Sequence, residues 1–264
     1  MNALTHLRRA LTATAFTASA ALTAFAAAQD QADAEGIELL RPTLDAHGGL
    51  DRWRDQGTFT YTLTGFPLSE PMSQPNTTTF DLQDRIVRID GQGFTVAFDG
   101  TYAWSTGQAN SAGLPSRFVT LGSSYFVAMP FVFADPGAIL TDGGTVNYRG
   151  VPHRAINVGY DNGVGASSED AYQLLIDPET DRLAAINHSV TEIGIERVTW
   201  AFPQWQPVDG LLVPARLEFT KGWDPDNTDP GAFTEVTDVD FDTAQPDASI
   251  YRPQAGSTID SVTE

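Results

Sequence analysis

The sequence predicts a mainly β (α+β) protein: an open, strongly curved antiparallel half-barrel of about ten or eleven strands, with one or two helices packed in or across its concave face. Segments of alternating apolar and polar residues recur between residues 58 and 242. Short turns rich in Asp, Gly and Pro separate them, as is typical of antiparallel strands. One helical stripe interrupts the strands, so the chain has an apolar segment available to cover the sheet.

Residues 1–28 have the pattern of a secretory signal peptide. Arg8 and Arg9 precede an uncharged apolar run from residue 10 to residue 25, and Ala26-Ala27-Ala28 supplies the small residues of a cleavage site. The alternative is a retained membrane anchor, but the run is shorter than the ~20 residues that span a bilayer. We therefore expect a mature protein in the periplasm, with secretion to the medium as an alternative.

After cleavage, residues 29–252 are expected to form one domain, followed by a flexible polar tail at residues 253–264. The domain opens with a predicted helix at residues 36–46, which His47-Gly48-Gly49 terminates. A short helical turn after it presents Trp53.

Strands dominate the rest of the domain. Residues 58–65 alternate strictly, with Phe59, Tyr61 and Leu63 on one face and threonines on the other. Further strands are expected at residues 77–82, 85–90, 93–98 and 101–105, and between residues 145 and 242. Asp99-Gly100 predicts a two-residue hairpin turn.

The interruption is the most apolar part of the mature chain. Phe118, Leu121 and Tyr125 have helical spacing over residues 116–129, and Pro130 ends the helix. This insertion is either core that plugs the barrel or a lid over an apolar cavity. On the strands, the aromatic residues expected to project from one side are Phe59, Tyr61, Phe94, Phe98, Tyr102 and Trp104. The side chains expected to line the cavity or its lid are Trp53, Tyr61, Phe98, Trp104, Phe118, Tyr125, Phe126, Met129, Phe131 and Phe133.

Charge and cysteine content exclude several classes of function. The chain has 15 Lys and Arg residues against 34 Asp and Glu residues, a net charge of −19. Arg8 and Arg9 belong to the signal peptide, so 13 basic residues stand against 34 acidic ones in the mature part, a net charge of −21. Such a surface repels nucleic acid and anionic lipid head groups. Without cysteine there is no disulfide, thiol nucleophile, thiolate ligand or lipid-anchor cysteine.

No catalytic or metal-binding constellation stands out, and no cofactor is expected. His47, His153 and His188 are far apart in sequence, and the chain has no Gly-x-Ser-x-Gly motif and no glycine-rich phosphate loop. A Ser-His-Asp triad, whose residues come together only in the folded protein, remains an alternative. The loop with Asp224, Asp226 and Asp229 is interpreted as a polar hairpin loop, with a calcium site as the alternative.

Five sequence features together resemble the bacterial outer-membrane lipoprotein carrier and sorting (LolA/LolB-like) superfamily. They are the signal peptide, the helix that ends in Ala46-His47-Gly48-Gly49 with Trp53 after it, Phe98-Asp99-Gly100 with Trp104, the apolar residues 129–137, and residues 205–214 (WQPVDGLLVP). The resemblance implies a half-barrel around a helix-lidded cavity that takes acyl chains. The mature chain is longer than the simple carrier and lacks the anchor cysteine of the receptor branch, so it looks closest to other exported relatives. None of the family's functional residues can be placed on it one by one.

The function expected is therefore non-enzymatic binding or carriage of a lipid or of lipoprotein acyl chains, with envelope proteins as further partners. No nucleic acid and no stable membrane insertion are expected. Two alternatives stay open. One is a non-catalytic structural or interaction module of the cell envelope, and the other is a hydrolase.

Overall fold

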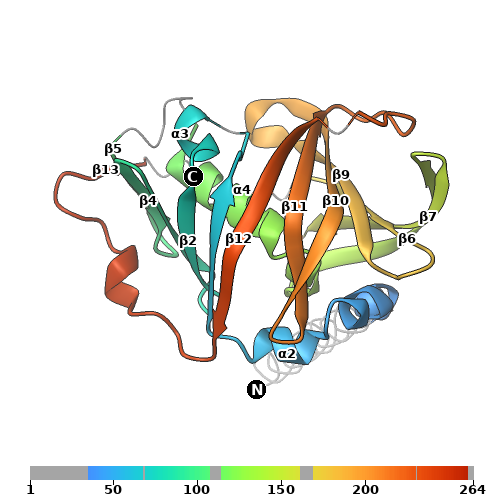
Figure 1. Ribbon diagram of the computed structural model, residues 1–264, viewed down its shortest axis with the longest axis horizontal. Coiled ribbons are helices and arrows are strands. Elements are labelled where there is room, and N and C mark those ends of the chain that lie inside the picture. Colours follow the sequence, from blue (N-terminus) through green and yellow to red (C-terminus); the bar gives the residue numbers. More distant parts are fainter. Residues whose placement is uncertain (1–34, 68, 108–113, 161–168, 230, 261–264) are drawn as a thin grey trace, which may run out of the picture.

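The computed structural model describes residues 35–67, 69–107, 114–160, 169–229 and 231–260. The expected signal peptide lies outside the described residues. Within them, thirteen strands form one antiparallel sheet, in the order β13-β5-β4-β3-β2-β1-β12-β11-β10-β9-β8-β7-β6 (Figure 1). In chain order the strands are β1 (Thr58–Thr64), β2 (Asn76–Asp81), β3 (Ile86–Gly91), β4 (Phe94–Phe98), β5 (Ala103–Gly107), β6 (Ala138–Tyr148), β7 (Val151–Tyr160), β8 (Tyr172–Ile176), β9 (Leu183–Val190), β10 (Ile195–Val208), β11 (Leu211–Lys221), β12 (Ala232–Asp242) and β13 (Thr258–Ile259).

The sheet is open, because its two edge strands, β13 and β6, do not pair with each other. Nearly every neighbour in the sheet is also a neighbour in sequence, and β1 pairs with β12 to join the two halves. The fold class predicted from the sequence is therefore confirmed: a mainly antiparallel, open, curved half-barrel with few helices.

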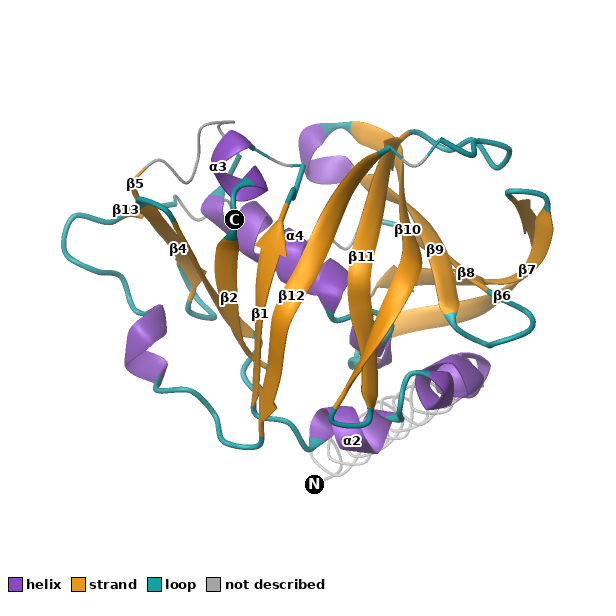
Figure 2. Cartoon of the chain, in the orientation of Figure 1, coloured by secondary structure: helices purple, strands orange, loops and turns teal. Residues whose placement is uncertain are grey.

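Helices occupy the concave side and the ends of the sheet (Figure 2). The first helix covers residues 35–46 of the described chain, and α4 (Ser116–Val127) runs across the sheet behind β12 and β11 in the view shown. The others are α2 (Leu50–Arg54), α3 (Glu70–Ser73) and the 3-10 turns η1 (Phe131–Ala134), η2 (Thr191–Ile193) and η3 (Ala248–Tyr251).

The first helix ends at His47-Gly48-Gly49 because two successive glycines turn the backbone into a region that favours glycine. Gly48 has a φ of 108°, and a Cβ placed on it would lie 2.2 Å from the carbonyl oxygen of Gly210. The backbone N–H of Leu212 donates to the carbonyl of His47 at 2.8 Å. The glycines thus let the β10–β11 turn pack directly against the end of the helix.

The main core lies between the concave face and the segment that crosses it. From β1, Phe59, Tyr61 and Leu63 enter this core, as their alternation predicted. From the other half of the sheet, Trp200 and Ile186 pair across β10 and β9 and face the same core. The two halves of the sheet therefore share one apolar interior.

Trp104 was expected on the concave side, but it lies on the outer face. It pairs with Ala97, whereas its neighbour on β5, Ala103, pairs with Phe98. Residues directly opposite each other in an antiparallel pair share a face, so Trp104 is on the side away from Phe98. Its indole N–H donates to the carbonyl of Tyr251 in η3 at 2.6 Å. Tyr102, expected beside it, is 46% exposed in the turn.

Three other expectations need correction. The turn after β4 has four residues rather than two, because Phe98 pairs with Ala103. Strand β6 begins at Ala138 rather than near residue 145. The expected flexible tail is not free over its described part, since Thr258 and Ile259 pair with β5.

Candidate functional site

The apolar insertion fills the concave face. Its second half is η1, in which Phe131, Val132, Phe133 and Ala134 are all buried. In α4, Val119, Phe126 and Val127 are buried. In the described structure the insertion is therefore part of the core, in the place where the sequence predicted either a plug or a lid.

The buried face of α4 carries hydroxyl groups that are satisfied within the helix. The hydroxyl of Thr120 donates to the carbonyl of Ser116 at 2.9 Å, that of Ser123 to Val119 at 2.8 Å, and that of Ser124 to Thr120 at 2.9 Å. These buried hydroxyls thus donate to carbonyl oxygens of their own helix, a pattern common for Ser and Thr in helices. Separating α4 from the sheet would leave these bonds intact.

The start of α4 is held by a residue from the far end of the chain. Pro115, the N-cap, makes no side-chain capping bond. The Asp260 carboxylate instead accepts from the Ser116 hydroxyl at 2.9 Å and from the Arg117 backbone N–H at 3.1 Å. Asp260 in turn donates its backbone N–H to Ala103 on β5 at 2.9 Å. A carboxylate at a helix N-terminus satisfies otherwise unpaired N–H groups and complements the helix dipole.

At the other end of α4 lies a group of aromatic and hydroxyl side chains, which we call the tyrosine cluster: Tyr125, Tyr160, Tyr172 and His188. The hydroxyls of Tyr125 and Tyr160 are hydrogen-bonded to each other. The rings of Tyr172 and His188 stack, with centroids 4.7 Å apart and an interplanar angle of 4°. Burial raises the pKa of all three tyrosines, so the cluster is uncharged at neutral pH.

His188 is 3% exposed and is held as a neutral ring. Its Nδ1 lies 2.7 Å from the carbonyl oxygen of Ser189, which can only accept, so Nδ1 carries the hydrogen. Burial lowers the pKa of His188 to about 4. Asp170, whose charge favours the protonated ring, already accepts from the Thr191 backbone and hydroxyl at 2.7 and 2.8 Å.

A second aromatic group, the His47 cluster (His47, Trp53, Phe131 and Trp205), joins three of the sequence features noted above. Trp53 stacks on Phe131 with ring centroids 4.6 Å apart. His47 lies edge-on to Trp205 at 4.3 Å. Segments near residues 47, 131 and 205 therefore meet at one end of the core. Burial lowers the pKa of His47 to about 4.

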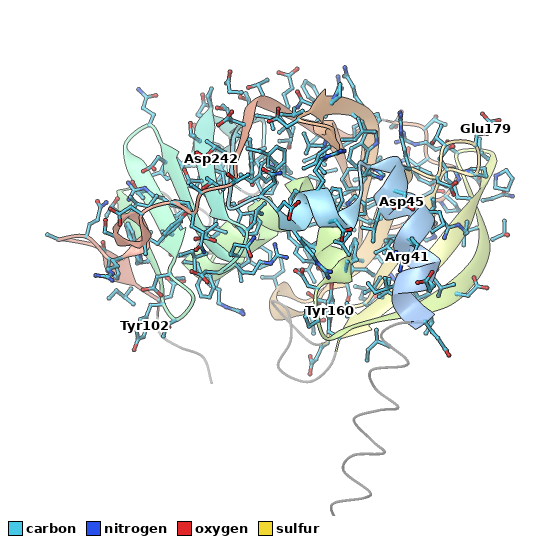
Figure 3. The ribbon with its side chains drawn as sticks, turned by 90° about the horizontal axis from the view of Figure 1, so that it is seen from below. Arg41, Asp45, Tyr102, Tyr160, Glu179 and Asp242 are labelled. Carbon is cyan, nitrogen blue, oxygen red and sulfur yellow. The ribbon has the colours of Figure 1, made fainter. Side chains whose placement is uncertain are left out.

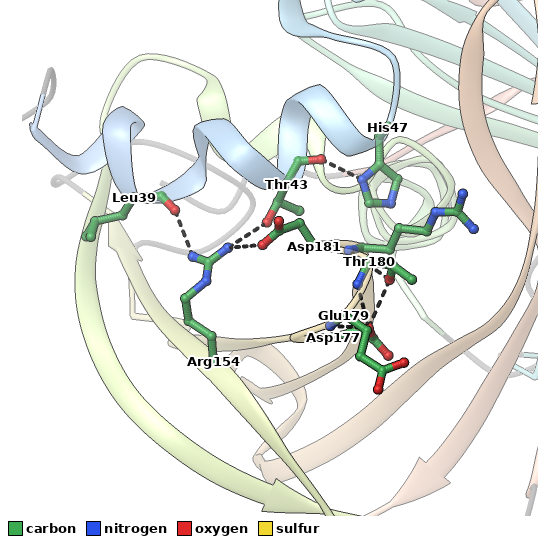
Figure 4. Close-up of polar contacts among 9 residues, drawn as sticks. Leu39, Thr43, His47, Arg154, Asp177, Glu179, Thr180 and Asp181 are labelled. Atoms are coloured by element: carbon green, nitrogen blue, oxygen red, sulfur yellow. Dashed lines mark hydrogen bonds and ion pairs between the residues drawn. The ribbon is translucent and has the colours of Figure 1, made fainter.

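Arg154 on β7 ties the first helix to the sheet (Figure 4). Its guanidinium donates to the carbonyl of Leu39 at 2.9 Å and to the Thr43 hydroxyl at 3.2 Å, and it lies 3.5 Å from the Asp181 carboxylate. The carbonyl of Thr43 accepts from Nδ1 of His47 at 2.7 Å. The opposite side of this helix carries Arg41 and Asp45, which Figure 3 shows on its exposed surface.

The ten side chains expected to line the site divide into three groups. Fully or nearly buried in the concave core are Trp53, Tyr61, Phe126, Met129, Phe131 and Phe133. Phe98, Phe118 and Tyr125 are partly exposed, and the Arg117 guanidinium lies over the Phe98 ring. Trp104 is separated from all of them by the sheet.

The sequence analysis did not include four residues that lie on the same concave face as Phe126: Tyr160, Tyr172, His188 and Trp200. Phe126 packs on Trp200 with centroids 4.4 Å apart and on His188 at 5.4 Å. Tyr172 pairs with His188 across β8 and β9. The local pattern gave little signal for His188 and Trp200, because their strand neighbours Asn187, Thr199 and Ala201 are buried too.

Two open surface grooves lie on the described part of the chain. One, of about 310 Å³, follows β6, β7 and β8 and includes Gln173, Arg197 and Tyr172, whose ring packs against Tyr125 and Phe133 of the insertion. The other, of about 570 Å³, lies between the first helix and α2 and includes Arg41, Asp45 and Arg52. Neither is lined by any of the ten expected residues.

Within the described ranges, no group of three or more His, Asp or Glu side chains could hold a metal ion. In the loop proposed as a calcium alternative, the Asp224 carboxylate instead accepts from the backbone N–H of Asp226 at 3.0 Å. A hydrogen bond from an Asp side chain to the backbone two residues further on is typical of a turn. His153 bonds to the carbonyl of Val151 on its own strand at 2.9 Å. No helix in the described part of the chain is long and apolar enough to span a bilayer.

Comparison with known proteins finds likeness in structure only. No family model matches the sequence, and no curated protein matches it. A LolA superfamily protein from Nitrosomonas europaea is similar with a TM-score of 0.49 and 8% identity, over 82% of this chain and 97% of that one. A DUF1329 family protein from Desulfovibrio piger ATCC 29098 gives a TM-score of 0.48 and 12% identity, over 80% and 98%. A putative outer membrane lipoprotein-sorting protein domain from Vibrio parahaemolyticus gives 0.39 and 11%, over 76% and 95%.

Proposed function

We propose that this protein binds a lipid, or the acyl chains of a lipoprotein, on the concave face of its half-barrel, and carries it through the periplasm. The acyl chain takes the place that α4 occupies in this structure, while η1 stays in the core. Exchange of α4 for the ligand keeps the interior apolar and filled in both states.

The observation that carries this proposal is the chemistry of α4. A helix that only plugged a core would be expected to show a strongly apolar buried face. Here Thr120, Ser123 and Ser124 are buried, and the hydroxyl of each donates to a backbone carbonyl of the same helix. Moving α4 off the sheet therefore breaks none of these three bonds. The bonds that it does break are those of Ser116 and Arg117 to Asp260 and that of Tyr125 to Tyr160.

The energies are of comparable size. Uncovering Val119, Phe126 and Val127 costs about 1.5–3 kcal/mol each, or about 5–9 kcal/mol together. An acyl chain that buries about 14 methylenes gains about 11 kcal/mol at ~0.8 kcal/mol per methylene. The ligand can thus offset the loss of the helix contacts, while a short chain cannot.

Bromine quenching of tryptophan fluorescence tests the proposal, because bromine quenches an indole only when the two are close. The probe is the N-methyl amide of dibromostearic acid, added to the purified mature protein. Trp53 and Trp200 lie in the concave core, whereas Trp104 lies on the outer face. We expect saturable quenching that Trp200→Phe diminishes.

Trp104→Phe is the matched control, because it removes an emitter that the ligand does not reach. The quenched fraction should therefore rise in this variant. No saturable quenching, or quenching that disappears with Trp104 rather than Trp200, would show that the concave face does not take an acyl chain.

A further inference from the structure

The tyrosine cluster contains a hydrogen-bond acceptor with no partner. In His188, Nδ1 donates to Ser189, so Nε2 carries a lone pair and no hydrogen. Nε2 is buried and has no hydrogen-bond partner among the described residues. Buried polar atoms are nearly always paired, and an unpaired acceptor is unfavourable.

The surroundings offer Nε2 no donor as long as α4 stays in place. Phe126 and Tyr172 pack against the His188 ring, at centroid distances of 5.4 and 4.7 Å. The hydroxyls of Tyr125 and Tyr160 are bonded to each other. Of the neighbours of His188, Phe126 belongs to α4, so displacement of α4 would uncover the ring.

We infer that Nε2 of His188 accepts a hydrogen bond from the polar end of the bound lipid, so that the protein prefers lipids with an amide N–H or a hydroxyl next to the acyl chain. This inference rests on the proposed function. An N-acylated amine carries such a hydrogen, and a simple ester does not.

Charge argues against an anionic head group at this place. The charged groups that act on His188 are Asp170 and Arg197, which have opposite signs, and the neutral ring itself offers an anion only a lone pair. Arg197 already donates to the Asn187 side-chain oxygen at 3.2 Å. Asp170 is held by Thr191 and would repel an anion. The net charge of the chain, −19, acts in the same direction.

Two ligands in which a methyl group replaces the amide hydrogen test the inference: the N-methyl and the N,N-dimethyl amides of dibromostearic acid. Both keep the carbonyl and the acyl chain, but only the first has an N–H. Dissociation constants come from quenching of the native protein. We expect the N-methyl amide to bind about tenfold more tightly, the difference that one well-made hydrogen bond supplies.

His188→Phe keeps an aromatic ring and removes the acceptor, so the ratio of the two affinities should fall to about one. His188→Gln retains an acceptor oxygen and should restore part of the preference, and it serves as the second variant if His188→Phe does not fold. His47→Phe is the matched control. It removes the other buried histidine whose Nε2 lacks a partner among the described residues, and it should leave the ratio unchanged.

The outcomes separate the inference from the proposed function. Quenching without discrimination in the native protein overturns the role of His188 and leaves acyl binding standing. Discrimination that survives His188→Phe, or that His47→Phe abolishes, also overturns it. Absence of quenching by both amides removes the proposed function and this inference with it.

Discussion

Removing the Asp260 carboxylate should release α4 from the sheet. This carboxylate accepts from the Ser116 hydroxyl and the Arg117 backbone N–H, at 2.9 and 3.1 Å, and α4 has no side-chain cap of its own. Hydrogen bonds to a charged group contribute about 1.5–3 kcal/mol, and an N-terminal cap about 1 kcal/mol. We therefore expect Asp260→Ala to cost about 2 kcal/mol, which raises the population of displaced α4 about 30-fold.

Hydrogen exchange followed by mass spectrometry measures this directly. Peptides from residues 116–127 should exchange about 30-fold faster in Asp260→Ala, while peptides from β1, β10 and β11 keep their rates. Asp247→Ala is the control, because the Asp247 carboxylate caps η3 instead, accepting from the Ser249 N–H at 2.8 Å. If α4 exchanges at the native rate in Asp260→Ala, or if all regions speed up together, Asp260 does not hold this helix.

Three further results are expected. Phe126→Glu should strengthen quenching by the brominated amide, because a charge cannot lie in the apolar face and α4 then leaves the sheet more readily; unchanged uptake would contradict a role for α4 in covering the site. Gly48→Ala should lower the free energy of unfolding in urea by at least ~2 kcal/mol, because its Cβ would lie 2.2 Å from a backbone oxygen. Gly49→Ala, with a φ of 95° and no atom within 4 Å of the Cβ, should cost only ~1 kcal/mol. Equal losses would refute the close approach. Burial lowers the pKa of His47 and His188 from 6.5 to about 4, so the unfolded chain binds more protons than the folded one in that window. The free energy of unfolding therefore keeps its full value above pH 6.5. As the pH falls from 6.5 to about 4, it decreases by about 3 kcal/mol for each of the two histidines. Urea unfolding at pH 7.5 and pH 4.5 should therefore show a smaller difference in His47→Gln/His188→Gln than in the native chain.

The local pattern of apolar and polar residues was enough to predict most strands of the sheet. Strict alternation in residues 58–65 predicted both the strand and the face that Phe59, Tyr61 and Leu63 bury. Helical spacing predicted the existence of α4, which ends at Val127, shortly before Pro130. Its expected apolar stripe of Phe118, Leu121 and Tyr125 is only partly buried, whereas Val119 and Phe126 face the core. The strand prediction succeeds because side-chain direction in a strand is set by position along that same element.

Strand register decides which face Trp104 occupies, and the error made there was avoidable. The observed four-residue turn pairs Trp104 with Ala97. The two-residue turn expected at Asp99-Gly100 would have paired it with Thr95, which lies on the same outer face as Ala97. Applying the pairing rule across the hairpin would therefore have placed Trp104 outside, whichever turn formed.

The sequence by itself determined the fold class, the order of most strands, the apolar insertion and the acidic surface, because each depends on periodicity, turn chemistry or composition. Only the tertiary structure decided that β13 pairs with β5 and brings Asp260 to α4, and that His188 stacks on Tyr172 beneath Phe126. These contacts join residues that are far apart in the chain. Their partners are chosen by the curvature and register of the whole sheet, and no local pattern records them.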